Sequence, residues 1–236
     1  MSASLALSLH NVYETLAISF PTVLEALGGR VTKEVCDDRL ESWARLVVEH
    51  AAIDLDVSGG ERRKPGETYL VMSNHQSLYD IPVLFHVIGS NLRMVAKKEL
   101  FGLPVFGGAL AAAGFIRIDR RDRSSAFESL RHGHALLTKG THVWIAPEGT
   151  RSHTGKLLPF KKGAFYLAFD AGMPILPVTL SGTQDVLPAH GLRSRTGAKV
   201  RVTIHDPIDP RPFSSRGKEG RQELMDRVRR EIESAL

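Results

Sequence analysis

Short apolar segments that alternate with helix-like segments are the feature that most constrains the fold of this chain. Seven segments are rich in β-branched and aliphatic side chains and are bounded by turn residues, as strands are. They cover residues 53–57, 69–73, 92–96, 115–118, 142–146, 175–180 and 200–205. Helical spacing of apolar side chains marks residues 81–88, 105–113, 125–139, 164–170 and 220–236. This alternation predicts an α/β fold, a single layered domain with a mixed, largely parallel sheet flanked by helices.

A separate helical pattern precedes these segments. Apolar residues at mostly helical spacing run through residues 4–29, and Pro21 is expected to kink or divide this helix. A second helix is expected at residues 38–49. We therefore expect an N-terminal helical segment over residues 1–36 and a main domain over residues 37–236. Two interpretations of the first segment stay open: it lies on a membrane surface, or it packs on the protein's own core.

Composition excludes several classes of protein. The chain has 236 residues, enough for one sizeable core, and a formal net charge of +5 that favours an anionic partner. Cys36 is the only cysteine, which excludes a disulfide framework and a thiolate-rich zinc site. No Lys or Arg precedes Arg30, so no secretory signal is expected. The longest uncharged stretch, residues 100–116, contains Pro104 and four glycines, so we expect no transmembrane helix.

A histidine and a carboxylate five residues apart follow the apolar run at residues 69–72: His75 and Asp80. Imidazole can take and return a proton near neutral pH. A carboxylate on its other ring nitrogen would fix the tautomer and stabilise the imidazolium. Because no serine or cysteine nucleophile lies in a supporting motif, we expect the proton to come from a substrate hydroxyl. The pair therefore favours an enzyme that activates an alcohol.

Three further segments fall at predicted strand ends. They are residues 114–120, 147–152 and 175–178. Ligands of open α/β sheets gather beyond the carboxyl ends of strands, so these segments are expected to converge on one crevice with His75. Arg120 and Arg151 would supply fork-shaped donors for a phosphate, and Gly149 would let backbone N–H groups approach it.

The joint pattern resembles a known family. Asn74-His75-x4-Asp80, followed by the segments at residues 114–120, 147–152 and 176–178, resembles the bacterial 1-acyl-glycerol-3-phosphate acyltransferases, which belong to the glycerolipid acyltransferases. The resemblance covers residues 53–210 and includes residues 96–100. One departure is Ala146, where the family commonly has Phe before Pro-Glu-Gly. The main domain is thus expected to be an acyltransferase domain.

The resemblance implies a mechanism. His75 would act as general base on the free sn-2 hydroxyl of lysophosphatidate, with Asp80 orienting it, and the oxygen would attack the thioester of acyl-CoA or acyl-carrier protein. The implied substrate-binding residues are Asn74, Ser77, Lys97, Arg120, Glu148, Gly149, Thr150, Arg151 and Pro177. The arginines would meet the phosphate, and Pro177 is tied to the acyl donor. For the oxyanion, the backbone N–H groups of residues 74–75 or 77–81 are the candidates.

Partners and location follow from the same resemblance. We expect the protein to bind peripherally to an anionic membrane surface at the cytoplasmic face of the cell membrane. We expect no cofactor, no metal and no nucleic acid. The basic run at residues 117–123 has few interleaved aromatics, which disfavours nucleic acid. His132 and His134 are two apart on a helix and point away from each other, which disfavours a metal pair.

Several alternatives stay open. The acceptor could be another lysolipid or glycerol 3-phosphate. The same histidine could activate water in a lipid ester or thioester hydrolase, or the chain could be a non-catalytic lipid-binding module. The small residues of the segment 101–113 suit either an acyl-chain groove or close helix packing. The last helix could dock on the core or contact a membrane.

Overall fold

The computed structural model describes residues 3–119 and 122–236 and has a seven-stranded sheet at its centre. The strand order is β2-β9-β7-β3-β6-β4-β5. These strands are β2 (Asp54–Ser58), β3 (Leu70–Ser73), β4 (Leu92–Lys97), β5 (Ile116–Ile118), β6 (His142–Ile145), β7 (Ile175–Ser181) and β9 (Lys199–Ile204). Within it, β7 and β9 pair antiparallel and the other neighbours pair parallel. The predicted mixed, largely parallel sheet is confirmed.

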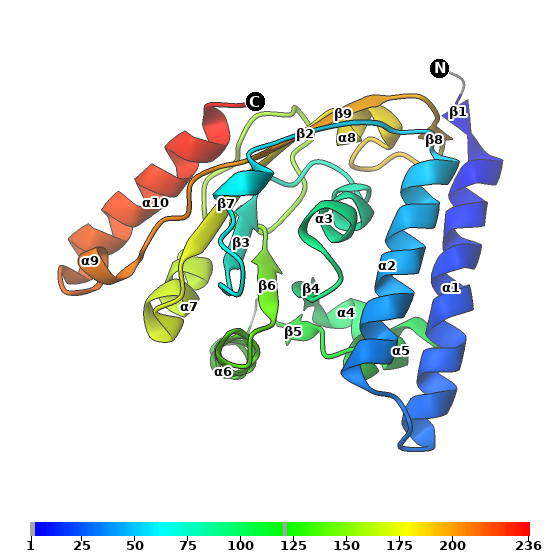
Figure 1. Cartoon of the computed structure of the whole chain (residues 1–236), viewed down its shortest axis with the longest axis horizontal. Helices are drawn as coiled ribbons and strands as arrows, with labels where there is room; N and C mark the ends of the chain where they lie inside the picture. The colour runs from blue at the N-terminus through cyan, green and yellow to red at the C-terminus, as the bar shows by residue number, and fades with distance from the viewer. Residues whose placement is uncertain (1–2, 120–121) are drawn as a thin grey trace.

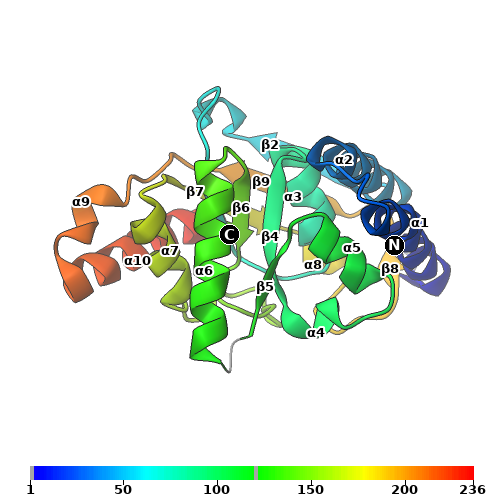
Figure 2. The same ribbon diagram turned by 90° about the horizontal axis from the view of Figure 1, so that it is seen from below.

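Helices cover both faces of the sheet (Figure 1). One layer contains α2 (Lys33–His50), α3 (Asp80–Ile88) and α5 (Phe106–Ala112), and the other contains α6 (Arg123–Thr138), α7 (Gly163–Ala171) and α10 (Gly217–Glu233). Figure 2 shows the sheet between these layers from below. Because β3 is buried on both faces, successive side chains enter different cores: Val71 packs with the first layer, and Leu70 and Met72 with the second.

The shortest elements were not predicted, and one helix start was misplaced. The unpredicted elements are β1 (Ala3–Ser4), η1 (Gly60–Arg62), α4 (Lys98–Phe101), α8 (Thr183–Val186), β8 (Ser194–Arg195) and α9 (Arg211–Ser214). Segments of two to four residues are too short to show a hydrophobic period. The helix α6 begins at Arg123, two residues before the start predicted at residue 125.

The N-terminal helices form an antiparallel hairpin (Figure 1). The first, α1 (Leu5–Leu27), is one continuous helix through Pro21, so the chain does not divide there as one alternative expected. Pro21 removes only its own N–H donor from the helix, and the flanking turns keep the segment helical. Residue 36, the expected end of the N-terminal segment, lies inside α2, the second helix of this hairpin.

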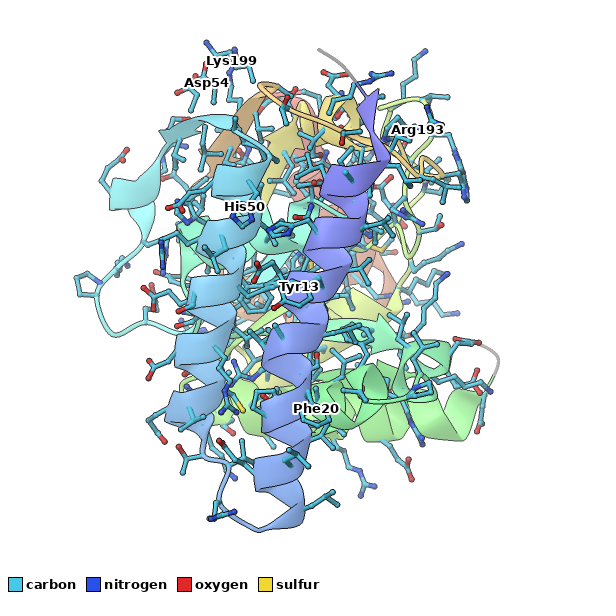
Figure 3. All side chains as sticks on the ribbon, turned by 90° about the vertical axis from the view of Figure 1, so that its right-hand side faces the viewer. Tyr13, Phe20, His50, Asp54, Arg193 and Lys199 are labelled. Carbon is cyan, nitrogen blue, oxygen red and sulfur yellow. The ribbon has the colours of Figure 1, made fainter. Side chains whose placement is uncertain are left out.

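One face of α1 is exposed in the part of the chain that the structure describes. Its large apolar side chains, each at least 43% exposed, are Leu5, Leu9, Val12, Tyr13, Leu16, Phe20, Leu24 and Leu27. We call this set the α1 stripe; Figure 3 looks onto it and labels Tyr13 and Phe20. The opposite side of α1 packs on the body of the protein. In the part of the chain that the structure describes, no helix combines the length and the apolar character needed to span a bilayer.

Two open questions from the sequence concern packing. At Gly107 and Gly108 the structure shows close contact: an added Cβ would lie 2.1 Å from the carbonyl oxygen of Phe101 and 3.1 Å from Val23 of α1, respectively. Small residues here thus allow α5 to approach α4 and α1. The last helix, α10, buries Leu224, Val228 and Ile232 in the second core, which confirms docking on the body.

Candidate active site

His75 and Asp80 meet at the junction between β3 and α3. The strand ends at Ser73 and the helix begins at Asp80, so the turn between them places both side chains beyond the carboxyl end of the strand. The His75 ring Nδ1 lies 2.6 Å from Asp80 Oδ2. Because a carboxylate oxygen only accepts, Nδ1 carries a proton, and in the neutral imidazole Nε2 then has the lone pair. The His75 side chain is 17% exposed and that of Asp80 is fully buried.

One oxygen of Asp80 accepts three hydrogen bonds. Besides the imidazole, the backbone N–H groups of Gln76 and Ser77 donate to Oδ2, at 2.7 and 2.9 Å. The carboxylate also stands in the first turn of α3, where the helix dipole favours negative charge. These interactions hold the buried Asp80 carboxylate next to the imidazole. The Asp80 carboxylate can therefore stabilise an imidazolium without changing position.

The histidine ring has an aromatic neighbour that sequence reasoning missed. The ring of Trp144, on β6, stands edge-on to that of His75 with centroids 5.6 Å apart. Its indole N–H donates to Ser73 Oγ at 2.9 Å, and that hydroxyl donates to the carbonyl of Asn74. Trp144 thus limits rotation of the imidazole on one side while Asp80 holds its Nδ1. The parallel pairing of β3 with β6 brings Trp144 here, and no local motif marks it.

Glu148 supports the backbone at His75. Its side chain is 1% exposed; Oε1 accepts the N–H of His75 at 2.9 Å, and Oε2 accepts the N–H of Leu158 at 2.7 Å. Burial raises the pKa of Glu148, and the two backbone N–H donors oppose that rise. One carboxylate oxygen therefore binds the backbone of His75, and the other binds the backbone of the loop that follows β6.

That loop wraps around His75. Ser152 donates its N–H to the carbonyl of His75 at 2.7 Å, so Glu148 and Ser152 bind the same residue's backbone from opposite ends. A turn closed by the Gly149 N–H and the Ala146 carbonyl, at 3.0 Å, starts the loop. Gly149 has a φ of 74°, a conformation that side chains with a Cβ rarely adopt. The backbone conformation of this turn therefore accounts for a glycine at residue 149.

Asn74 and Ser77 are bound to the protein's own backbone. The Asn74 amide exchanges two hydrogen bonds with the backbone of Leu180 on β7, at 2.7 and 2.8 Å. Ser77 Oγ donates to the Leu187 carbonyl at 2.7 Å and accepts the Tyr79 N–H at 3.1 Å. These contacts anchor the turn on both sides of His75.

The structure narrows the candidates for the oxyanion. Five of the candidate backbone N–H groups already donate to protein acceptors, namely those of His75, Ser77, Tyr79, Asp80 and Ile81. A donor that is committed to another acceptor does not present its hydrogen to a developing oxyanion. These amides are therefore not the oxyanion stabiliser in this conformation.

The other predicted site residues lie in the loop after β6 and on β4 and β7, apart from Arg120. Thr150 is exposed and Arg151 is half-buried; both immediately precede Ser152 in the loop that binds His75. Lys97 is exposed at the carboxyl end of β4, and Pro177 is buried within β7 beside Met72 of β3. Arg120 lies outside the described residues.

Two surface cavities lie at the opposite edge of the sheet. Their volumes are about 430 and 380 Å³, and both are lined by Arg63, Asn91 and His142. His142 begins β6 and so marks the amino ends of the parallel strands, whereas His75 follows the carboxyl end of β3. The cavities are therefore separate from the His75–Asp80 pair.

Comparison with known proteins gives consistent matches. A family model described as "Acyltransferase" matches residues 54–181, a span that includes His75, Asp80 and Glu148. The chain is 37% identical over 167 residues to the chloroplastic 1-acyl-sn-glycerol-3-phosphate acyltransferase BAT2 of Brassica napus, over 70% of this chain and 48% of that protein. It is 36% identical over 191 residues to 1-acyl-sn-glycerol-3-phosphate acyltransferase alpha of Homo sapiens, over 78% of this chain and 66% of that protein.

A solved structure matches nearly the whole chain. The crystal structure of the 1-acyl-sn-glycerophosphate (LPA) acyltransferase PlsC from Thermotoga maritima superposes with a TM-score of 0.79 and 28% sequence identity. The match covers 98% of this chain and 95% of that chain. The chain spans about half to two thirds of the length of the curated relatives above. On the family model, the relatives and the fold together, this chain belongs to the Acyltransferase family.

Proposed function

We propose that this protein transfers a fatty acyl group from acyl-CoA or acyl-carrier protein to the sn-2 hydroxyl of 1-acyl-glycerol-3-phosphate, giving phosphatidate. The observation that carries the proposal is the 2.6 Å contact between His75 Nδ1 and Asp80 Oδ2 beyond the carboxyl end of β3. It leaves Nε2 as a base on a partly exposed ring. Relatives named as 1-acyl-sn-glycerol-3-phosphate acyltransferases support the choice of substrate class.

The proposed chemistry needs one base and no covalent enzyme intermediate. His75 Nε2 takes the proton of the acceptor hydroxyl as its oxygen attacks the thioester carbonyl. A carbon–oxygen bond forms, the carbon–sulfur bond breaks, and the proton passes from the imidazolium to the leaving thiolate. Asp80 remains ionised and stabilises the imidazolium meanwhile. Trp144 and Asp80 together keep Nε2 aimed at the acceptor.

We assign the acceptor's phosphate to the basic groups around this centre. Arg151 is half-buried one residue before Ser152, which binds the His75 backbone, so it supports a phosphate contact close to the base. In the family pattern, the phosphate site also includes Arg120, Lys97 and Thr150. Pro177 is assigned to the side of the acyl donor. For Asn74, Ser77, Glu148 and Gly149 the contacts described above support a role in shaping the site through the backbone.

We further propose that the α1 stripe rests on an anionic membrane, so that the protein is peripheral at the cytoplasmic face. The proposal is supported by the row of exposed apolar side chains on α1 and by the formal charge of +5. An amphipathic helix binds a surface through its apolar face, while basic residues attract anionic lipids. A hydroxyl on a lysolipid would then reach the enzyme from the bilayer.

The decisive experiment mixes the purified full chain with lysophosphatidate in vesicles and an acyl thioester, and identifies products by mass. Phosphatidate should form, and His75→Ala should lower turnover by about 10²–10⁴-fold or more. The control is His190→Ala, which removes an exposed histidine outside the His75–Asp80 pair. A panel with glycerol 3-phosphate and other lysolipids defines the acceptor. Thioester consumption that is equally fast without any acceptor would show a hydrolase instead, and an unchanged rate in His75→Ala would exclude the mechanism.

A further inference from the structure

The interface between α1 and α2 is a seam of polar contacts. Arg39 on α2 donates to Thr22 Oγ1 at 3.0 Å and to Glu25 Oε1 at 2.8 Å. One helical turn further along α2, the Trp43 indole N–H donates to Thr15 Oγ1 at 3.1 Å. The seam therefore joins the two helices by directional groups rather than by apolar packing alone. Toward the start of α1 and the end of α2, the contacts between the two helices are made by ionisable side chains instead.

Two histidines and a carboxylate meet at this end of the seam. His10 and Glu14 stand one turn apart on α1, and His50 is the last residue of α2. His10 Nε2 lies 3.1 Å from His50 Nδ1 and 3.3 Å from Glu14 Oε1. The candidate ligand atoms of all three side chains lie within 4.8 Å of one another. Figure 3 labels His50 and shows its ring between the two helices.

We propose that His10, Glu14 and His50 bind a divalent transition-metal ion, zinc in the first place, which fastens α1 to the end of α2. Two imidazole nitrogens with one carboxylate oxygen form a ligand set that suits zinc. Zinc holds such ligands at about 2.0–2.1 Å in a tetrahedron, which places neighbouring ligand atoms roughly 3.3 Å apart. The separations of 3.1 and 3.3 Å at His10 Nε2 fit that spacing.

The charges at the site also favour a cation. Without an ion, His10 Nε2 faces two acceptor-capable atoms at once, and a single proton on it serves only one of them well. An ion between the three ligands would satisfy all of them together. His50 also ends α2, where the carbonyl end of the helix dipole attracts positive charge. The fourth position of a tetrahedral ion would be left to water.

This site is independent of the proposed reaction, because its residues belong to the hairpin and not to the turn that carries His75. We expect a bound ion to stabilise the packing of α1 against α2. The α1 stripe lies on a helix that α2 connects to the body, and an ion at this end would fasten the two helices where α2 leads into β2. Metal binding should therefore protect the hairpin against local opening.

The test titrates zinc into the metal-free full chain against a chromophoric chelator and measures stoichiometry and affinity. We expect one ion per chain, and at least about tenfold weaker binding in His10→Ala, His50→Ala and Glu14→Gln. The matched control is the double variant His153→Ala/His190→Ala. That pair has its Nε2 atoms 3.1 Å apart, yet belongs to no such three-ligand group among the described residues. Its loss should leave the affinity unchanged.

Two further readouts separate binding from folding. Cobalt(II) in place of zinc should give the intense visible bands of a tetrahedral site in the unaltered protein and not in His50→Ala. Zinc should raise the thermal midpoint of the unaltered protein, while Glu14→Gln, which keeps the seam of Arg39 and Trp43, should fold but lose most of that rise. The proposal is overturned if no ion binds at one per chain, if the three variants bind as before, or if binding is lost in the His153/His190 variant instead.

Discussion

At the scale of single residues, His75 is held by hydrogen bonds on every side except Nε2. Asp80 binds its ring, Glu148 accepts its backbone N–H, and Ser152 donates to its carbonyl. The supporting groups are themselves buried, so the geometry is set before any substrate arrives. Preorganisation of this kind makes the site sensitive to changes that preserve size but alter hydrogen bonding.

Asp80→Asn tests the orientation of the base. An amide in place of the carboxylate cannot accept the imidazole proton and both backbone N–H groups with the same strength, and it favours the wrong tautomer of His75. We expect turnover to fall by about 10²–10⁴-fold, measured at saturating acceptor. Asp185→Asn, at an exposed position, is the matched control and should keep full activity. Activity near the unaltered level in Asp80→Asn would contradict the assigned role.

Glu148→Gln tests the support of the His75 backbone. The carboxylate accepts one N–H with each oxygen, whereas an amide presents N–H groups of its own to one of those donors. The unfolding free energy should fall by about 1–3 kcal/mol, measured by chemical denaturation, and activity should fall with it. The exposed Glu61→Gln should change neither. A stable but inactive Glu148→Gln protein would point to direct contact with substrate instead.

At the scale of elements, α1 shows what periodicity predicts and what it leaves open. The spacing of its apolar residues predicts a helix correctly, and the helix continues through Pro21. The same residues could have faced the core or the solvent, because periodicity defines a stripe and not its partner. In the structure Asn11, Thr15 and Thr22 face the protein, and the α1 stripe faces outward.

Leu16→Glu combined with Phe20→Glu tests the α1 stripe. Both side chains are exposed, so the double variant should fold with little change in stability. Its binding to anionic vesicles should weaken at least tenfold in a sedimentation assay, because two apolar groups no longer enter the lipid and two like charges face it. The control Val57→Glu places the same charge at an exposed position on β2. Equal binding by both proteins would show that another surface meets the membrane.

At the scale of the whole molecule, the largely parallel sheet separates two histidines in different surroundings. His75 follows the carboxyl end of β3, whereas His142 begins β6 at the other edge and accepts the Tyr69 N–H on Nδ1 at 3.0 Å. Burial, with the charges of Arg63 and Lys33, lowers the pKa of His142 from 6.5 to about 4. His142 is therefore a neutral structural group that links β3 to β6.

The pH dependence of the unfolding free energy should reflect proton binding at His142. Between pH 6.5 and about 4 the unfolded chain binds a proton at this residue that the folded protein does not, so the unfolding free energy falls as the pH is lowered through that window. One pKa unit corresponds to about 1.4 kcal/mol, so the loss is on the order of 3 kcal/mol. His142→Gln should flatten this part of the profile, measured by denaturation at each pH. Burial also lowers the pKa of His205, which should leave a slope of the same sign in that variant.

Most of the architecture could be predicted because it is encoded locally. The strands at residues 69–73 and 142–146 appear within a residue or so of their predicted limits, as an apolar run between turn signals requires. His75 and Asp80 are close because only a strand-to-helix turn separates them. Arg120, by contrast, lies outside the described residues, and its phosphate contact remains a prediction.

The amino-acid sequence by itself determined the order of strands and helices along the chain, the largely parallel character of the sheet and the pair of His75 with Asp80, because the alternation of segments and the spacing of that pair are local patterns. Only the tertiary structure decided which groups surround that pair and which face of α1 stays exposed. Glu148 is 73 residues from His75, and His50 is 40 residues from His10. Contacts at such separations depend on how strands pair and helices pack, and no local pattern of side chains records that choice.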